Sequence, residues 1–221
     1  MEIKIVKKIL AKNDAAAGEL RSLFAGKQIL VVNLMSSPGS GKTALLDKTL
    51  ELLGGSLRAA VIEGDIATTL DSERLARHNV PLVQVNTDTF GGDCHLEANM
   101  IAGAVEQLDL QALDLLFIEN VGNLVCPAEF DLGEDMKVAL LSATEGEDKP
   151  LKYPLMFKVC GTAVITKCDL TEALEFDAGA AEANVLKVNP RTHVLHTSAK
   201  TGQGVDGWIA LLKERLNAKR A

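Results

Sequence analysis

The stretch SSPGSGKT at residues 36–43 decides the fold of this chain, because of what stands on either side of it. The apolar run QILVVNLM (28–35) precedes it, and KTALLDKTLELL (42–53), with apolar residues at helical spacing, begins at its last two residues. A buried strand, a Gly-rich turn ending in Gly-Lys-Thr and a helix are the context in which backbone N–H groups turn toward phosphate oxygens. The sequence therefore predicts a phosphate-binding loop at the end of a strand.

The residues of this loop have separate predicted roles. Gly39 and Gly41 let the backbone turn tightly, while Lys42 reaches the β- and γ-phosphates of a nucleotide and Thr43 ligates Mg²⁺. Ser36 stands where the usual pattern begins with Gly, which leaves the phosphate-contacting half intact. The residues that we expect to contact the nucleotide here are Pro38, Gly39, Ser40, Gly41, Lys42, Thr43 and Ala44.

Further apolar runs alternate with helical segments along the rest of the chain. The runs lie at 59–64, 81–87, 114–120, 137–143, 161–167 and 192–198. The helical segments lie at 69–78, 96–108, 177–188 and 204–219, whereas 120–135 and 144–160 have the pattern of long loops. Together with the run at 28–35, this alternation predicts an α/β fold with a doubly wound, mostly parallel sheet of seven strands flanked by helices. Ligands of such sheets lie beyond the carboxyl ends of the strands.

Length and composition favour one domain. A chain of 221 residues, 47% hydrophobic and 24% charged, fits a single buried core. We expect residues 1–26 to form an amphipathic helix packed on a domain of residues 27–221. The formal net charge of −7 disfavours nucleic acid as a partner. Because no apolar run reaches roughly eighteen residues and the N-terminus is too polar for a secretory signal, we expect no membrane span and a cytoplasmic location.

Carboxylates end two of the predicted strands. LLFIENVG (115–122) carries Glu119 and Gly122, whose N–H can meet a γ-phosphate, and VIEGD (61–65) carries Glu63 and Asp65. Either carboxylate alone is common as a solvated strand end. With a phosphate-binding loop in the same sheet, we expect Asp65 and Glu119 to complete a Mg²⁺ and water site. The predicted catalytic residues are therefore Lys42, Asp65, Glu119 and Gly122.

Two later motifs indicate which base is bound. In ITKCD (165–169), the stem of Lys167 can lie along a purine, and Asp169 can accept from the N1–H and N2–H₂ of guanine, a donor pair that adenine lacks. After the last predicted strand, HTSAKTG (196–202) adds Ser198, Ala199 and Lys200. In identity and order, SPGSGKT, ENVG, TKCD and SAK resemble the motifs of P-loop GTPases, with Thr166 where that class usually has Asn.

The cysteines offer a second kind of site. There are four, at positions 94, 126, 160 and 168, and the absence of a secretory signal favours reduced thiols over two disulfides. DCHL (93–96) puts Cys94 beside His95 at the predicted start of a helix, where a thiol ionises more easily, and NLVCP (123–127) carries Cys126. These three side chains form an S₂N set suited to Zn²⁺ or Ni²⁺. The alternative, packing as small hydrophobic residues, is our interpretation of Cys160 and Cys168.

A family resemblance extends over nearly the whole chain. GGDCHLEANM (91–100) and ENVGNLVCP (119–127), together with SSPGSGKT and EGD, resemble the hydrogenase nickel-incorporation GTPases of the SIMIBI class, the HypB family. The resemblance implies GTP hydrolysis with Mg²⁺, a homodimer formed around GTP, and transfer of Ni²⁺ toward the [NiFe]-hydrogenase large subunit with a HypA-like metallochaperone. It also implies that Ni²⁺ or Zn²⁺ is held by Cys94, His95 and Cys126, that Lys42 and Thr43 contact phosphate and Mg²⁺, and that Asp65 and Glu119 are switch carboxylates.

Two alternatives remain open from the sequence. A urease- or cobalamin-enzyme-type maturation GTPase would share the nucleotide motifs, although the urease type carries Cys-Pro-His where this chain has CPAE (126–129). The chain could instead be a zinc- or nickel-binding regulatory module with negligible nucleotide turnover. Metal binding through Cys94, His95 and Cys126 distinguishes the hydrogenase type from the first alternative. A functional requirement for Lys42 distinguishes a working GTPase from the second.

Overall fold

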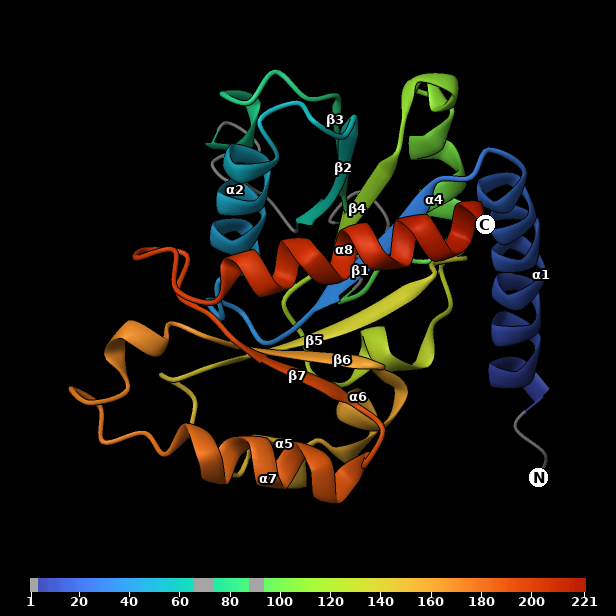
Figure 1. Cartoon of the computed structure of the whole chain (residues 1–221). Helices are drawn as coiled ribbons and strands as arrows, with labels where there is room; N and C mark the ends of the chain where they lie inside the picture. Colours follow the sequence, from blue (N-terminus) through green and yellow to red (C-terminus); the bar gives the residue numbers. More distant parts are fainter. Residues whose placement is uncertain (1–3, 66–73, 88–93) are drawn as a thin grey trace.

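The computed structural model describes the backbone of residues 4–65, 74–87 and 94–221, and the side chains from residue 10 onward within those ranges except that of Asp65. Its strands are β1 (Leu30–Met35), β2 (Ala59–Asp65), β3 (Leu82–Asn86), β4 (Leu115–Glu119), β5 (Met136–Ser142), β6 (Thr162–Thr166) and β7 (His193–His196). In the described residues these seven strands form one sheet in the order β3-β2-β4-β1-β5-β6-β7, and every pair is parallel (Figure 1). The predicted parallel sheet is confirmed, and no strand end differs from its prediction by more than two residues.

Helices cover both faces of the sheet. One face packs against α2 (Lys42–Leu53) and α8 (Val205–Arg220), and the other against α1 (Lys4–Gly26), α4 (Ala98–Val105), α6 (Pro154–Val159) and α7 (Ala178–Val188). Side chains of successive strand residues point to opposite faces, so Val32 joins the core under α2 and α8 whereas Val31 joins the core under α1 and α4. This double burial explains why β1 is apolar at nearly every position.

Most of the predicted helices are confirmed. The observed starts of α2, α7 and α8 lie within one residue of prediction, but α4 is shorter than the predicted segment 96–108. Half of the predicted helix at 69–78 lies outside the described residues, and its described part is helical at 74–76. Among the described residues, no helix is long and apolar enough to cross a membrane.

The segment 144–160, predicted as a long loop, contains two helices. These are α5 (Lys149–Lys152) and α6, and each has a proline in its first turn, Pro150 and Pro154. Proline is tolerated there because the first N–H groups of a helix have no partner within the helix. Helices this short carry too few residues to display a 3.6-residue period, yet Met156 and Phe157 are fully buried. The loop prediction was therefore wrong because tertiary burial, and not a local pattern, stabilises these turns.

Helix α1 packs closely on the domain at two places. Ala17, Leu20 and Phe24 are buried in one cluster with Ile101 of α4. The helix also lies against the backbone of Gly133, which has a left-handed φ of 81°. A Cβ added to Gly133 would lie 2.8 Å from the Cβ of Leu20 and 2.9 Å from the carbonyl oxygen of Ala17. Only glycine fits at this contact.

Replacement of Gly133 by alanine should therefore destabilise the protein in two ways. The left-handed backbone costs roughly 1 kcal/mol with a Cβ, and the collision with α1 adds about 1–3 kcal/mol. The matched control is Gly55→Ala, because Gly55 has a similar φ of 79° but no atom within 4 Å of an added Cβ. Urea denaturation should give a clearly lower free energy of unfolding for Gly133→Ala than for Gly55→Ala. Equal losses in both variants would contradict the close packing of α1.

Candidate functional site

The Gly-rich loop between β1 and α2 has the backbone geometry expected of a phosphate-binding turn. Gly39 and Gly41 both have a left-handed φ, of 72° and 94°, and Gly41 caps the N-terminus of α2, which begins at Lys42. Most side chains strain the backbone in this region, which accounts for glycine at both positions. The Lys42 ammonium donates to the Ser36 hydroxyl at 3.1 Å. Ser36, the departure from the usual pattern, thus orients the lysine.

A cavity of about 360 Å³ opens over this loop. Its lining comes from the loop itself, from the ends of β2 and β4 and from the segment after them, namely Pro38, Gly39, Gly41, Lys42, Thr43, Ala44, Glu63, Gly64, Arg74, Glu119, Asn120, Val121 and Gly122. The Thr43 hydroxyl donates to Glu119 at 2.8 Å, so two of the three predicted Mg²⁺ ligands meet. Gly122, which follows β4, packs directly against the Gly-rich loop: an added Cβ would be 2.8 Å from Cα of Pro38. Asp65 ends β2, but its side chain lies outside the described part of the structure.

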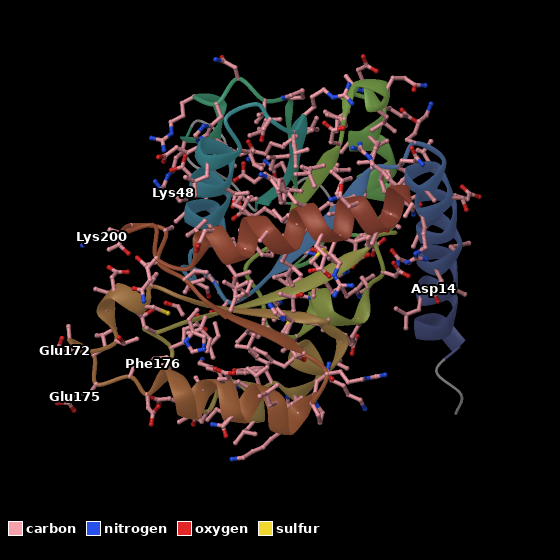
Figure 2. All side chains as sticks on the ribbon, in the orientation of Figure 1. Asp14, Lys48, Glu172, Glu175, Phe176 and Lys200 are labelled. Atoms are coloured by element: carbon pink, nitrogen blue, oxygen red, sulfur yellow. The ribbon has the colours of Figure 1, made fainter. Side chains whose placement is uncertain are left out.

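A second cavity of about 200 Å³ adjoins the first at Gly41 and Ala44. It is lined by Gly41, Ala44, Leu45, Thr166, Lys167, Asp169, Leu170, Thr197, Ala199 and Lys200. Ser198 lies beside this cavity, where its hydroxyl donates to Asp169 at 2.6 Å. Lys200 is exposed and projects away from the molecule (Figure 2). The residues predicted to contact the base are therefore gathered around one hollow, next to the residues predicted to contact phosphates.

Two side chains connect these cavities. The Thr166 hydroxyl donates to the carbonyl of Ser40 at 2.6 Å, and the Lys167 ammonium donates to the carbonyl of Gly39 at 2.7 Å. Thr166 stands where P-loop GTPases usually have Asn, a residue that bonds to nearby loops. The hydroxyl makes such a bond here, so the substitution preserves the link between the two loops.

Sequence reasoning missed Glu145, which lies in the segment after β5. Its two carboxylate oxygens accept from the hydroxyls of Ser40 and Ser37, each at 2.5 Å, and Oε1 also accepts from the backbone N–H of Ser142. Hydrogen bonds to a charged acceptor are about twice as strong as neutral ones. Glu145 thereby fixes the outer side of the Gly-rich loop. No local pattern marks it, since it lies more than a hundred residues away from Ser37 and Ser40.

The predicted metal ligands form a cluster. One ligand atom from each of Cys94, His95 and Cys126, hereafter the thiol-imidazole cluster, lies within 4.8 Å of the others. The two sulfur atoms are 2.8 Å apart, and the Cys94 sulfur lies 3.9 Å from Nδ1 of His95. Stacking on the Phe130 ring, with centroids 3.9 Å apart, orients the imidazole. The three side chains are half-buried, and all four cysteines of the chain are free thiols.

One detail of the thiol prediction was wrong. Cys94 does not open a helix, because α4 begins only at Ala98. A hydrogen bond with Cys94, together with burial, raises the pKa of the Cys126 thiol. Burial also raises the pKa of Cys160 and of Cys168, and Cys160 lies in the core. The interpretation of Cys160 as a packing residue therefore agrees with its surroundings.

Asparagines of the segment after β4 join the thiol-imidazole cluster to the phosphate cavity. The Asn120 side chain accepts from the backbone N–H of Leu96 at 3.2 Å, and Asn120 also lines the phosphate cavity. Asn123 donates to the carbonyl of Cys94 at 3.3 Å. Both asparagines thus attach the loop of Cys94 to the segment that carries Cys126. The phosphate cavity and the thiol-imidazole cluster share one stretch of chain.

The parallel sheet, the Gly-rich loop at the end of β1 and the adjoining cavities define a P-loop nucleotide-binding protein of the SIMIBI class. The family model described as "CobW/HypB/UreG, nucleotide-binding domain" matches residues 30–196. The hydrogenase maturation factor HypB of Azotobacter chroococcum is 51% identical over 217 residues, which are 98% of this chain and 70% of that protein. The chain therefore belongs to the HypB family of hydrogenase maturation factors.

Solved structures of relatives have the same fold. A crystal structure of HypB from Helicobacter pylori in complex with nickel superposes with a TM-score of 0.88 at 37% identity, covering 94% of this chain and 96% of that one. The hydrogenase maturation factor HypB of Archaeoglobus fulgidus superposes with a TM-score of 0.87 at 37% identity, over 94% and 100% of the two chains.

Replacement of Glu145 by alanine should loosen the Gly-rich loop. It removes the shared acceptor of the Ser37 and Ser40 hydroxyls, and bonds to charged groups contribute about 1.5–3 kcal/mol each. Hydrogen exchange of the amides of Ser37, Gly39 and Ser40 should accelerate at least tenfold. Glu147→Ala is the control, because Glu147 lies in the same segment but accepts from Asp177 instead. If the loop exchanges at the same rate in both variants, Glu145 does not hold it.

Proposed function

We propose that this protein is a GTP-hydrolysing metallochaperone that binds Ni²⁺, or Zn²⁺, at the thiol-imidazole cluster and supports nickel insertion into [NiFe]-hydrogenase. The observation that carries the proposal is that the ligand atoms of Cys94, His95 and Cys126 lie close together. Cys126 belongs to the segment after β4, and that segment also borders the phosphate cavity. Membership of the HypB family and the nickel complex of a relative support the choice of cargo.

The chemistry of the cluster suits a metal that must be released. Two thiols and one imidazole are soft and intermediate ligands, which favour Ni²⁺ or Zn²⁺ over Mg²⁺. Three protein ligands leave a four-coordinate ion one ligand short. Water, a moved residue or a second subunit must complete the coordination, so the metal remains accessible to an acceptor.

The phosphate cavity suits hydrolysis of a nucleoside triphosphate. Lys42 neutralises phosphate charge, and the N–H groups of Gly41 and Gly122 border the cavity where the γ-phosphate would lie. The hydroxyl of Thr43 and the carboxylate of Glu119, 2.8 Å apart, are hard oxygen donors that fit Mg²⁺, with Asp65 as a further proposed ligand. When bound, Mg²⁺ would supply charge stabilisation for the β- and γ-phosphates. These residues would position the γ-phosphoryl group for attack by water, with GDP as the leaving group.

We propose guanine as the base, bound in the smaller cavity. The Ser198 hydroxyl occupies one side of the Asp169 carboxylate, which orients that group toward a base in the cavity. The stem of Lys167 lines one wall, and Ala199 and Lys200 border the far side. An ionised carboxylate accepts only, so it recognises the two neighbouring N–H donors of guanine and excludes adenine.

We also propose that GTP and metal binding are coupled. Asn120 borders the phosphate cavity and binds the loop of Cys94, so a movement of this segment on GTP binding would displace Cys126 relative to Cys94. A tenfold change in metal affinity requires only about 1.4 kcal/mol of coupling, and the metal must then change GTP affinity by the same factor.

The proposed partners follow from the family. They are a second copy of the chain in a GTP-dependent homodimer, a HypA-like nickel metallochaperone and the hydrogenase large subunit, all in the cytoplasm. We retain the division into a helix at 1–26 and a GTPase domain at 27–221 as part of this proposal. Nucleic acid and membranes are not proposed partners, given the net charge of −7.

Equilibrium Ni²⁺ and Zn²⁺ titrations test the metal proposal. The wild type should bind one ion per chain, and Cys94→Ala, His95→Ala and Cys126→Ala should each lose at least tenfold in affinity. Cys168→Ala is the control, because Cys168 is half-buried but lies outside the cluster. Each titration is repeated with GDP and with a non-hydrolysable GTP analogue. Unchanged binding in the three variants would refute the site, and identical affinities with both nucleotides would refute the coupling.

Nucleotide competition tests the base. Asp169→Asn exchanges an acceptor for a donor at the guanine edge, so GTP affinity should fall about 10- to 100-fold while the affinity for xanthosine triphosphate, which has a carbonyl at that edge, rises. Asp177→Asn is the control, since Asp177 caps α7 away from the cavity.

Hydrolysis should cease in Lys42→Ala. If hydrogenase maturation survives that change, the protein is a metal-binding regulator and not a working GTPase.

A further inference from the structure

We propose that Asn13 of helix α1 is a positioning residue for the thiol-imidazole cluster, because its side-chain amide joins the two loops that supply the thiols. This inference rests on the proposed metal site. It concerns a residue that touches neither metal nor nucleotide and acts through the backbone of both loops. Asn13 lies in the N-terminal helix, far from the cluster in sequence.

The Asn13 amide makes one hydrogen bond to each loop. Its oxygen accepts from the backbone N–H of Ala98 at 2.8 Å, and its nitrogen donates to the backbone carbonyl of Asp131 at 2.8 Å. Ala98 follows His95 by three residues and Asp131 follows Cys126 by five. Asn13 is only 1% exposed. A buried side chain therefore spans the two chain segments whose separation sets the distance between the sulfur atoms.

The bond to Ala98 satisfies a need that the local sequence leaves open. Ala98 is the first residue of α4, and the N–H groups at a helix start have no partner within the helix. The residue before it, Glu97, makes no side-chain cap. Asn13 supplies the missing acceptor from a different helix. The start of α4, and with it the loop of Cys94 and His95, is thereby held against α1.

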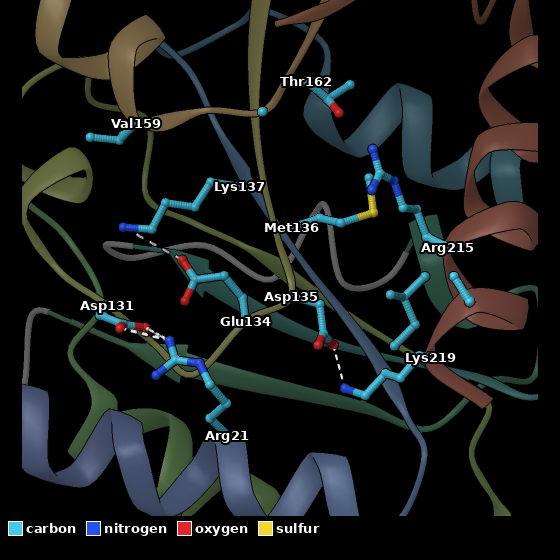
Figure 3. Close-up of a pocket in the computed structure, with 13 residues that line it drawn as sticks. Arg21, Asp131, Glu134, Asp135, Met136, Lys137, Val159, Thr162, Arg215 and Lys219 are labelled. Atoms are coloured by element: carbon cyan, nitrogen blue, oxygen red, sulfur yellow. Dashed lines mark hydrogen bonds and ion pairs between the residues drawn. The ribbon is translucent and has the colours of Figure 1, made fainter. Parts of the chain in front are cut away.

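Further contacts from α1 hold the end of the other loop. Arg21 donates to both carboxylate oxygens of Asp131, at 2.6 and 2.7 Å, and Figure 3 shows the two side chains facing each other at the edge of a cavity of about 590 Å³. Two residues further along, Gly133 lies directly against the helix backbone. The exposed ion pair with Arg21 is weakly stabilising, whereas the buried amide bond from Asn13 resists solvent competition.

The amide makes both bonds because it carries both a donor and an acceptor. Alanine offers neither partner, and aspartate can accept from Ala98 but cannot donate to the carbonyl of Asp131. Residues that orient metal ligands from outside typically change metal affinity 10- to 100-fold when replaced. Loss of the Asn13 side chain should therefore change metal affinity without any change at the ligands themselves.

The test compares Asn13→Ala, Asn13→Asp and Phe24→Leu in the full chain. Phe24 is a fully buried residue of the same helix whose side chain has no polar atom, so its shortening weakens the packing of α1 without removing a hydrogen bond to either loop. Ni²⁺ affinity is measured by competition with a chromophoric chelator, and the Co²⁺ absorption spectrum reports the ligand geometry. Hydrogen exchange follows the amide of Ala98 and those at 126–133.

We expect Asn13→Ala to weaken Ni²⁺ binding about 10- to 100-fold, to alter the Co²⁺ spectrum and to accelerate exchange in both loops. Asn13→Asp should keep Ala98 protected while the segment 126–133 exchanges faster. Phe24→Leu should lower thermal stability and leave Ni²⁺ affinity within about twofold of wild type. Equal Ni²⁺ affinity in wild type and both Asn13 variants overturns the proposal, as does an equal loss in Phe24→Leu.

Failure of the metal site itself gives a different result. If Cys126→Ala binds Ni²⁺ as tightly as wild type, the proposed function is wrong, whatever Asn13 does. Hydrogen exchange still decides the positioning role in that case. Unchanged protection of Ala98 and of 126–133 in Asn13→Ala overturns it, and selective loss of protection supports it.

Discussion

Parallel pairing on both sides of β1 is the constraint on which the site depends. β1 pairs with β4 and β5, and because all the strands run the same way, their carboxyl ends lie along one edge of the sheet. The Gly-rich loop leaves β1 at this edge, Glu119 ends β4 beside it, and Glu145 follows β5. A reversal of either neighbouring strand would move these carboxylates to the opposite edge, where they could not meet Thr43 or Ser40.

The same edge brings the thiol-imidazole cluster and the phosphate cavity together on one segment of the chain. From Glu119 at the end of β4, the chain passes through Asn120, which binds Leu96, and Asn123, which binds Cys94, before it reaches Cys126. The two proposed sites are therefore only a few residues apart along the backbone. In the coupling that we propose, a displacement that begins at the γ-phosphate would have a short, hydrogen-bonded route to the sulfur atoms, and no long-range network through the core is required.

The sequence predicted those parts of the molecule that a local pattern encodes. Strands buried on both faces are apolar runs, and the Gly-rich loop needs glycines at left-handed positions, so the sheet and the residues around Lys42 were predictable. The thiol-imidazole cluster was predictable from its unusual residue types. Glu145 and Asn13 were not, because a carboxylate and an amide are ordinary surface residues until the fold supplies distant partners. The short helices α5 and α6 were missed for the same reason, since burial of Pro150 in α5 and of Met156 and Phe157 in α6 stabilises them.

The attachment of α1 to both loops also orders the assembly of the chain. The residue that joins them precedes its two partners by 85 and 118 positions, so the helix is made first and can join the two loops only after Asp131 has been synthesised. Contacts between such distant residues form slowly, because a long stretch of chain must lose conformational entropy before the contact stabilises it. While residues 95–125 are synthesised, the nascent chain therefore carries Cys94 without Cys126. If the cluster binds metal as we propose, an ion offered during this interval meets a single thiol, and loading at the complete site requires the folded protein.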